Sequence, residues 1–489
     1  MSLSELGLAA RGGREAMVSG LTVDSREAGP GMLFAALPGS RVHGATFAAS
    51  VLEKGVAAVL TDPEGARLAA GALADAPAAL VVVEEPRAAL SRAAALWFGA
   101  PPEVMVAVTG TNGKTSVATF ARQIWAALGH PAINLGTTGI EGAWEAPLHH
   151  TTPDPITLHR ALAEAAAAGI THAAMEASSH GLDQHRLDGV RLAAAAFTNF
   201  TQDHLDYHHS FDAYFAAKAR LFSEVLPEDG TVVANMNDPA GTRVAAIAAA
   251  RGQELIGVGH SAACDLRITG QRFDATGQDL RFVWKGQAYQ ARLSLIGGFQ
   301  AENVLVAAGL TIAAGEPAEA VFGVLDRLAT VRGRMQLAAT RANGASVFVD
   351  YSHTPDAIAT ALKALRPHVL GRLVIVFGAG GDRDRGKRPL MGAAAAEHAD
   401  LCIVTDDNPR SEDPTAIRAA VLAACPGATE IGDRAEAILR GAAALGPGDA
   451  LLIAGKGHES GQTIGSTTYP FDDVEQASLA VAALDGRRA

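Results

Sequence analysis

The sequence predicts an α/β protein made of three domains, and three observations support this fold class. Short apolar runs alternate with helical patterns along the chain, which is typical of parallel sheets covered by helices on both faces. The chain has 489 residues, which is more than a single hydrophobic core usually serves. Polar or glycine-rich loops follow several predicted strands, and ligands gather at such strand ends in doubly wound sheets.

The N-terminal domain is expected to cover residues 1–101 and to have a small α/β fold. One predicted strand ends at Thr22–Arg26, and three more are Met32–Ala36, Val56–Thr61 and Ala79–Glu84. Pro101 and Pro102 then predict a linker, because proline stiffens the chain and blocks helix formation.

The central domain is expected to span residues 102–331, again with strands and helices in alternation. Its predicted strands are Val104–Val108, Ala173–Glu176, Ala194–Thr198 and Thr231–Asn235. Helices are predicted over Thr115–Leu128, Phe211–Val225 and Glu302–Ala314. The segment Leu266–Leu295 alternates apolar and polar residues, which predicts antiparallel hairpins.

Residues 332–489 repeat the alternation and predict a C-terminal, Rossmann-like doubly wound domain. The four predicted strands are Ser346–Asp350, Leu373–Phe377, Leu401–Thr405 and Ala450–Ala454. A polar or glycine-rich loop follows each of them, so we expect a binding site at this edge of the sheet.

Composition excludes several classes of function. The net charge of −12 argues against nucleic-acid binding, since such domains usually carry a basic surface. Cys264, Cys402 and Cys425 have neither metal-site nor CxxC spacing, so we expect buried free thiols. The N-terminus lacks a signal-peptide pattern, and no apolar run reaches membrane-spanning length. We therefore expect a cytoplasmic protein without membrane insertion, and nothing in the sequence requires more than a monomer.

The loop Thr109–Ser116 carries the sharpest signal for chemistry, because it joins a buried strand to a helix and contains Gly-Lys-Thr. Glycines let backbone N–H groups turn toward phosphate oxygens, and the helix N-terminus adds partial positive charge. Lys114 can reach the outer phosphates of a nucleotide, and Thr115 can ligate magnesium. The central domain is thus predicted to be a P-loop-like ATPase, although Val108 replaces the first glycine of the common motif. A purely structural turn is the disfavoured alternative.

Two further side chains follow strands of the same sheet. Glu176 ends the strand His172–Glu176, where a carboxylate can hold magnesium. His204 lies in a segment rich in histidine and aspartate after another strand. Such histidines often only bond to their own loops, so loop support and metal or phosphate contact both stay open for His204.

Lys218 lies on the apolar face of the predicted helix Phe211–Val225. Spacing alone favours snorkelling, in which the stem is buried and the ammonium group reaches water. The alternative is a desolvated lysine with a lowered pKa, whose neutral amine can react with carbon dioxide to give a magnesium-binding carbamate.

Three loops of the C-terminal domain bring together basic, acidic and amide side chains. They are Gly380–Pro389, Asp406–Arg410 and Gly455–Glu459. Arginine pairs with a carboxylate in a fork, and Asp or Glu pairs with an ammonium group. The loops together therefore predict a site for a zwitterion, whereas any one alone is equally well explained as a solvated loop.

These motifs, in this order, resemble the Mur ligase family through nearly the whole chain. The family's own loop reads Thr-Gly-Thr-Asn-Gly-Lys-Thr, which accounts for Val108. Asp407-Asn408-Pro409-Arg410 resembles the signature of the members that add diaminopimelate. Lysine-adding members differ at the last position, which makes Arg410 the discriminating residue.

The resemblance implies roles for individual residues. It implies that Lys114, Glu176, His204 and Lys218 are catalytic, and that Mg²⁺ is held by Thr115, Glu176, His204 and Lys218 as N6-carboxylysine. The implied ATP contacts are Gly110, Thr111, Asn112, Gly113, Lys114, Thr115, Ser116, Asn303, Arg334 and Asp350. The implied UDP-muramoyl-dipeptide contacts are Ser25, His43, Thr151, Thr152, Ser178, Gln184 and Arg186. The implied diaminopimelate contacts are Arg383, Asp407, Asn408, Pro409, Arg410, Gly455 and Glu459.

The implied activity is a condensation in peptidoglycan synthesis that cleaves ATP to ADP and phosphate. The small-molecule partners would be UDP-N-acetylmuramoyl-L-alanyl-D-glutamate, meso-2,6-diaminopimelate and ATP, with an acyl phosphate as the intermediate. Three alternatives stay open: a lysine-adding or other Mur ligase, a folylpolyglutamate synthase-like ligase, and a non-catalytic nucleotide-binding regulator.

Overall fold

The computed structural model describes residues 1–39, 42–74, 76–148, 150–201, 203, 205–274 and 276–486. The chain forms two compact units. The first contains Met1–Leu266 and Leu305–Val321, and the second contains Arg267–Val304 and Phe322–Ala489.

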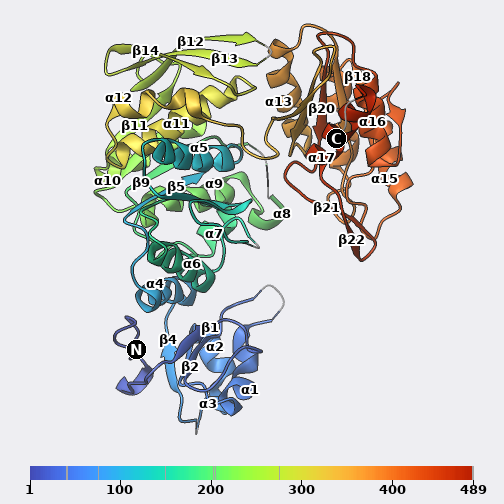
Figure 1. Cartoon of the computed structure of the whole chain (residues 1–489). Helices are drawn as coiled ribbons and strands as arrows, with labels where there is room; N and C mark the ends of the chain where they lie inside the picture. The colour runs from blue at the N-terminus through green and yellow to red at the C-terminus, as the bar shows by residue number, and fades with distance from the viewer. Residues whose placement is uncertain are drawn as a thin grey trace. The chain divides into compact units, whose positions relative to one another are not determined.

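The first unit begins with a four-stranded parallel sheet, which Figure 1 draws in blue. Its strand order is β1-β2-β3-β4. The strands are β1 (Gly20–Thr22), β2 (Met32–Ala35), β3 (Ala58–Thr61) and β4 (Ala79–Val82). The helices are α1 (Ala48–Glu53), α2 (Pro63–Leu68), α3 (Ala70–Leu73) and α4 (Pro86–Phe98). Successive strand residues enter opposite cores, since Leu33 packs in one cluster and Phe34 in another.

The larger sheet of this unit has the strand order β11-β10-β9-β5-β8-β6-β7. The strands are β5 (Val104–Thr109), β6 (Ala132–Gly136), β7 (Gly139–Gly142), β8 (His172–Glu176), β9 (Ala194–Phe197), β10 (Thr231–Asn235) and β11 (Leu255–Gly259). Only β7 pairs antiparallel. The helices are α5 (Lys114–Ala127), α6 (Pro155–Ala167), α7 (Ser179–Asp183), α8 (Leu205–His208), α9 (Phe211–Arg220) and α10 (Pro239–Arg251).

An Asp-Pro pair begins four of the helices, and this explains where they start. In each, the Asp carboxylate accepts a backbone N–H of the first turn, and proline occupies a position that needs no hydrogen bond. The pairs start α2, α6, α10 and α15 (Pro414–Leu422), with caps Asp62, Asp154, Asp238 and Asp413.

The helix expected over Phe211–Val225 is shorter than predicted. α9 ends at Arg220, and Leu221–Val225 form a π-helical turn. Arg251 explains why the wider turn is tolerated, because its guanidinium donates to the carbonyls of Phe222 at 2.6 Å and Leu226 at 2.7 Å.

The second unit contains the predicted antiparallel hairpins and a six-stranded sheet. The hairpin strands are β12 (Leu266–Asp274), β13 (Gly277–Trp284) and β14 (Gln287–Leu293), and α11 (Phe299–Ala313) and α12 (Ala318–Phe322) follow in the chain. The sheet order is β15-β16-β20-β17-β18-β19. Its strands are β15 (Gln336–Thr340), β16 (Ser346–Asp350), β17 (Leu373–Phe377), β18 (Leu401–Val404), β19 (Thr429–Glu430) and β20 (Ala450–Ala454).

All of these strands except β15 run parallel, and the chain returns through β20 between β16 and β17. The helices are α13 (Pro355–Leu365), α14 (Lys387–His398), α15, α16 (Arg434–Ala443) and α17 (Asp473–Leu484). A hairpin of β21 (Gly461–Ile464) and β22 (Thr467–Pro470) follows the last parallel strand. The carboxyl ends of β16, β17, β18 and β20 therefore share one edge.

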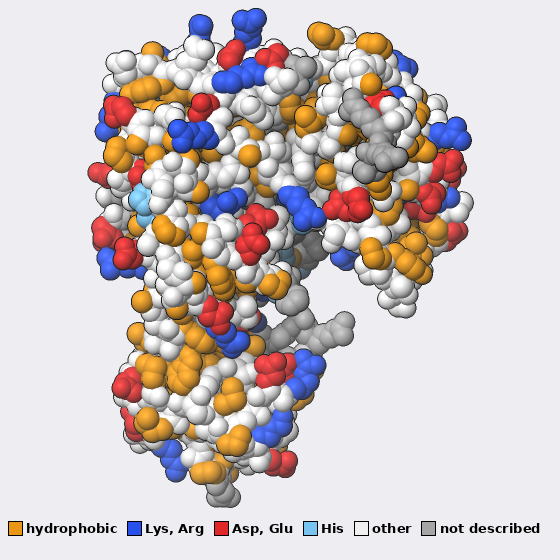
Figure 2. Space-filling view, viewed as in Figure 1, with side chains coloured by type: hydrophobic (Ala, Val, Ile, Leu, Met, Phe, Trp, Pro, Cys, Tyr) orange, Lys and Arg blue, Asp and Glu red, His pale blue; other side chains and the backbone are white. Residues whose placement is uncertain are grey.

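Cys402 and Cys425 are buried free thiols as expected, but Cys264 is only half-buried, because it lies in a turn after β11. No helix in the described part of the chain is long and apolar enough to cross a membrane. On the face drawn in Figure 2, the described Lys and Arg side chains are interspersed with Asp and Glu and form no broad basic surface.

Candidate active site

The loop between β5 and α5 has the conformation that a phosphate-binding loop needs. Gly110 has φ +148° and Gly113 has φ +85°, and a Cβ atom on Gly110 would lie 1.9 Å from Oγ1 of Thr198. Position 110 therefore accepts only glycine. The Thr198 hydroxyl donates to the Asn112 carbonyl at 2.6 Å and holds the turn. The backbone N–H groups at the start of α5 face this loop, and Thr115 and Ser116 are buried there.

Two lysines converge on one carbonyl oxygen in this loop. Nζ of Lys114 lies 2.8 Å and Nζ of Lys218 lies 2.7 Å from the oxygen of Gly110. The Lys218 side chain is 2% exposed, and its Nζ lies 4.6 Å from the centre of the Tyr214 ring. Burial, and then the charge of Lys114, lower the pKa of Lys218 well below its usual range.

The snorkelling interpretation of Lys218 is therefore wrong. The ammonium group does not reach water, since α9 directs it under the phosphate loop. Helical spacing identifies the face on which a side chain lies, but it does not report how deep that face is buried.

Glu176 lies next to this loop, because Val108 and Glu176 are paired in the parallel register of β5 and β8. Its side chain is buried, and one carboxylate oxygen accepts the backbone N–H of Thr137 at 2.9 Å. A Cβ on Gly136 would lie 1.9 Å from that oxygen, so the glycine makes room for the carboxylate. Thr137, which the sequence did not single out, thus fixes the Glu176 carboxylate.

The residues expected to contact a muramoyl dipeptide form one hydrogen-bonded group beside Glu176. The Thr152 hydroxyl donates to the backbone oxygen of Glu176 at 2.9 Å and accepts the N–H of Ser178 at 3.0 Å. Arg186 donates to the Thr152 carbonyl and, at 2.7 Å, to Oε1 of Gln184. Thr151 joins through its hydroxyl, which lies 3.0 Å from that of Thr137.

Ser25 and His43 follow neighbouring parallel strands, β1 and β2. Ser25 is half-buried, and its carbonyl accepts Nζ of Lys54 at 2.7 Å. His43 uses both ring nitrogens within the protein: Nδ1 accepts the N–H of Ala45 at 3.0 Å, and Nε2 lies 3.1 Å from Oδ1 of Asp62. His43 therefore supports the loop that would contact a ligand. His204 lies outside the described residues.

The remaining expected nucleotide contacts lie in the second unit. Asp350 ends β16 and accepts the N–H groups of Met335 at 2.6 Å and Ser352 at 3.0 Å. The neighbouring Arg334 guanidinium lies 4.6 Å from the centre of the Tyr351 ring. The sheet edge thus presents an arginine and an aromatic ring together. Asn303 is buried on α11 and donates to Oε1 of Gln300 at 3.1 Å.

Two of the three loops expected to bind the amino acid meet around Asn408. Its Nδ2 donates to Oε2 of Glu459 at 2.9 Å, and its Oδ1 accepts Nζ of Lys456 at 3.0 Å. Asp407 packs against Gly455, where a Cβ would lie 2.5 Å from the Asp407 carboxylate. Sequence reasoning missed Lys456, which is fully buried although it lies between two glycines.

The third loop, Gly380–Pro389, is held to the loop Asp406–Arg410 by Arg410. Arg410 has φ +51°, and its guanidinium donates to the Gly381 carbonyl at 2.8 Å. Arg383 is exposed and lies 3.4 Å from the Asp382 carbonyl. Other basic residues of this loop are engaged by the protein, since Glu412 accepts Arg388 at 2.8 Å and Arg385 at 3.1 Å.

A buried ion pair, also missed from the sequence, supports these loops from below. Arg434 and Asp473 are both fully buried and lie 2.7 Å apart. Arg434 also donates to the Ala454 carbonyl at 3.1 Å, immediately before the loop Gly455–Glu459, and to the Asp406 carbonyl at 3.4 Å, at the start of the loop Asp406–Arg410. A buried pair of this kind fixes geometry, because removing either partner leaves an uncompensated charge.

The donor set around the phosphate loop fits magnesium only in part. The Thr115 hydroxyl and the Glu176 carboxylate are oxygen ligands of the kind that Mg²⁺ prefers. A protonated Lys218 does not fit, because it is a cation, whereas the carbamate of a neutral Lys218 would be a third oxygen ligand.

The chain matches the models of three domains along its length: Mur ligase family, catalytic domain, over residues 17–98; Mur ligase middle domain over residues 108–311; and Mur ligase, glutamate ligase domain, over residues 333–457. It belongs to the Mur ligase family. The family resemblance and the three-domain α/β fold class are thereby confirmed, and the chain is a ligase.

Relatives in this family are similar over nearly their full length. The UDP-N-acetylmuramoyl-L-alanyl-D-glutamate--2,6-diaminopimelate ligase of Caulobacter vibrioides is 49% identical over 476 residues, which is 96% of each chain. The enzyme of the same name from Bradyrhizobium diazoefficiens is 49% identical over 471 residues, or 95% of each chain. A solved structure of a ligase of this name is 34% identical, with TM-score 0.71 and 95% of each chain covered. A folylpolyglutamate synthase from Mycobacterium tuberculosis, at 19% identity, 82% of this chain and 95% of that one, and TM-score 0.63, shares the fold alone.

Proposed function

We propose that this Mur ligase adds meso-2,6-diaminopimelate to UDP-N-acetylmuramoyl-L-alanyl-D-glutamate, with cleavage of ATP to ADP and phosphate. The observation that carries the proposal is the full-length similarity to relatives with that activity in their names. The cluster of Asn408, Arg410, Lys456 and Glu459 supports the choice of a zwitterionic amino acid, because it presents cationic and anionic groups together.

In this proposal the phosphate loop binds ATP, and Lys114 stabilises the charge that develops on the transferred phosphoryl group. The dipeptide carboxylate attacks the γ-phosphate, which releases ADP and forms an acyl phosphate. An amine of diaminopimelate then attacks the acyl carbon, loses a proton and expels phosphate. Thr152, Ser178, Gln184 and Arg186 are proposed to position the dipeptide next to Glu176.

Mg²⁺ belongs to the proposal as the ion that neutralises phosphate charge when bound. Thr115, Glu176 and a carbamylated Lys218 would hold it, together with His204. Burial lowers the pKa of Lys218 and so favours the neutral amine, which is the form that reacts with carbon dioxide.

The proposal also covers the domain boundaries and the other substrate contacts. The proposed domain boundaries are residues 1–101, 102–331 and 332–489. Ser25 and His43 are proposed for the UDP end of the substrate, and Asn303, Arg334 and Asp350 for the nucleotide. Arg383, Asp407, Pro409 and Gly455 are proposed to complete the diaminopimelate site. We propose a cytoplasmic monomer with small-molecule partners and no nucleic acid.

Product analysis tests the proposal. The full-length protein is incubated with ATP, Mg²⁺, the UDP-muramoyl dipeptide and meso-diaminopimelate, and the products are weighed by mass spectrometry. We expect an amide whose mass equals the dipeptide plus diaminopimelate minus water, formed in equal amount with phosphate. ATP binding without any amide product would contradict it.

A further inference from the structure

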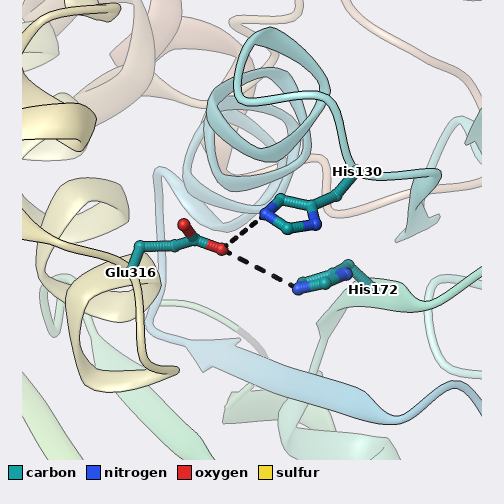
Figure 3. A group of neighbouring side chains, drawn as sticks. All are labelled: His130, His172 and Glu316. Carbon is teal, nitrogen blue, oxygen red and sulfur yellow. Dashed lines mark ion pairs between the residues drawn. The ribbon is translucent and has the colours of Figure 1, made fainter.

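A second group of metal-ligating side chains lies away from the phosphate loop, in the same compact unit. Figure 3 shows His130, His172 and Glu316 converging from three segments of the chain. His130 lies between α5 and β6, His172 begins β8, and Glu316 follows α11. One ligand atom from each residue lies within 4.8 Å of the other two.

The group is at the opposite end of the sheet from the proposed catalytic residues. Glu176 ends the strand that His172 begins, so four residue steps of about 3.3 Å, or roughly 13 Å, separate their backbones. His130 likewise follows the C-terminal end of α5, whereas the phosphate loop precedes its N-terminal end. No residue of this group therefore takes part in the proposed ligase site.

The geometry directs one nitrogen of each ring toward one carboxylate oxygen. Nε2 of His130 lies 2.9 Å and Nε2 of His172 lies 3.9 Å from Oε1 of Glu316. The two rings lie close together, with centres 4.2 Å apart. A neutral imidazole can donate one N–H to this carboxylate, and two imidazole nitrogens that face it with their lone pairs can share a metal ion with it.

The other nitrogen of His172 is already engaged. Its Nδ1 lies 2.8 Å from Oγ1 of Thr171, and the Thr171 hydroxyl donates to the Pro131 carbonyl at 3.4 Å. When the hydroxyl donates to the carbonyl, Nδ1 carries the hydrogen and Nε2 keeps its lone pair toward Glu316. Such hydrogen bonding at the far nitrogen is the arrangement that orients metal-binding histidines in proteins.

Burial is also suited to a bound ion. The side chains of His172 and Glu316 are 10% and 13% exposed, whereas His130 is 36% exposed. The exposed edge of His130 gives an ion a way in and leaves a coordination position for water.

We propose that His130, His172 and Glu316 form a binding site for a divalent transition-metal ion of the zinc class. Two imidazoles and one carboxylate favour Zn²⁺, Co²⁺ or Ni²⁺ over Mg²⁺, which prefers oxygen ligands. The bound ion would tie the segment before β6, the start of β8 and the segment after α11 together. It would therefore stabilise the folded chain by RT ln(1 + c/Kd), where c is the free ion concentration, so the stabilisation increases with c.

The test is a titration of chelator-treated, full-length protein with ZnCl₂ by calorimetry, with excess Mg²⁺ present to occupy the proposed catalytic ion site. The variants are Glu316→Gln, which keeps the side-chain volume, His130→Asn and His172→Ala. His260→Ala is the matched control, because His260 is an exposed histidine of the same unit. Co²⁺ absorption and the melting temperature are recorded for each protein.

We expect about one equivalent of Zn²⁺ to bind to the wild type and the control. In the site variants we expect affinity to fall at least about tenfold, consistent with loss of a ligand. The Zn²⁺-dependent rise in melting temperature and the visible bands of bound Co²⁺ should disappear in Glu316→Gln, while its phosphate release with substrates is retained. Equal Zn²⁺ affinity in wild type and Glu316→Gln, or no saturable binding to the wild type, would overturn the proposal.

Discussion

Among the described residues, each compact unit buries one lysine almost completely, but the two are surrounded differently. Lys218 is 2% exposed and meets a carbonyl, an aromatic ring and a second lysine. Lys456 is 0% exposed and meets the amide of Asn408 and, at 3.4 Å, the carboxylate of Glu459. Equal burial therefore produces a lysine suited to become neutral in one unit and a paired cation in the other.

The largest expected effect is at Lys218. Lys218→Ala should lower kcat for phosphate release by about 10²–10³, the usual consequence of losing one preorganised charge-stabilising group. Short carboxylic acids such as acetate should restore part of the activity to Lys218→Ala, because they supply the missing anion. They should restore none to Lys114→Ala, which serves as the control. Full activity in Lys218→Ala would remove the carbamate role.

His159 is a third buried base, and burial is the main cause of its pKa shift. Its Nε2 has no hydrogen-bond partner among the described residues, and burial lowers the pKa of His159 from 6.5 to about 4. At pH values between about 4 and 6.5, His159 therefore binds a proton in the unfolded chain but not in the folded chain. Stability should fall as pH drops from about 6.5 to about 4, by up to about 3 kcal/mol at ~1.4 kcal/mol per pKa unit.

Urea unfolding at pH 7 and pH 4.5 measures this effect. His159→Leu should lose less stability between the two pH values than the wild type does, and the exposed His260→Leu should behave as the wild type. The same pH dependence in all three proteins would show that His159 is not the group responsible.

Lys456 should behave as a structural and binding cation. Lys456→Met should lower the free energy of unfolding by about 1–3 kcal/mol, since it removes the buried, charged donor that Asn408 and Glu459 share. KM for diaminopimelate should rise and KM for ATP should stay the same. Lys285→Met, at an exposed lysine of the same unit, is the control. An unchanged KM for diaminopimelate would separate Lys456 from the amino-acid site.

The smallest expected effect concerns selectivity. Arg410→Lys should lower the preference for meso-diaminopimelate over L-lysine, measured as the ratio of kcat/KM values, by about tenfold. Loss of one charge-assisted hydrogen bond contributes about 1.5–3 kcal/mol, and 1.4 kcal/mol corresponds to a factor of ten. The ratio should be unchanged in Arg385→Lys, because this arginine of the loop Gly380–Pro389 pairs with Glu412.

The sequence predicted the parts of this protein that depend on local pattern. Four strands end at Thr109, Glu176, Asp350 and Ala454, each within one or two residues of the end that the sequence predicts. They were predictable because buried parallel strands are continuous apolar runs. The glycines of the phosphate loop were also predictable, because backbone N–H groups can approach a phosphate only there.

Features that depend on depth or on distant segments could not be predicted. Lys456 lies between two glycines, a pattern that is typical of an exposed loop, yet the strand order places β20 at the centre of its sheet. Arg434 and Asp473 are 39 residues apart in the chain. Glu316 and the two histidines that it meets come from three separate segments, and no spacing rule connects them.

The most direct test of the central claim is phosphate release from ATP in the presence of the UDP-muramoyl dipeptide, with either meso-diaminopimelate or L-lysine added. We predict strong release with diaminopimelate and little with lysine, together with an amide product of matching mass. Equal release with both amino acids would leave the ligase class and contradict the role of Arg410, and no release with either would contradict the proposed reaction.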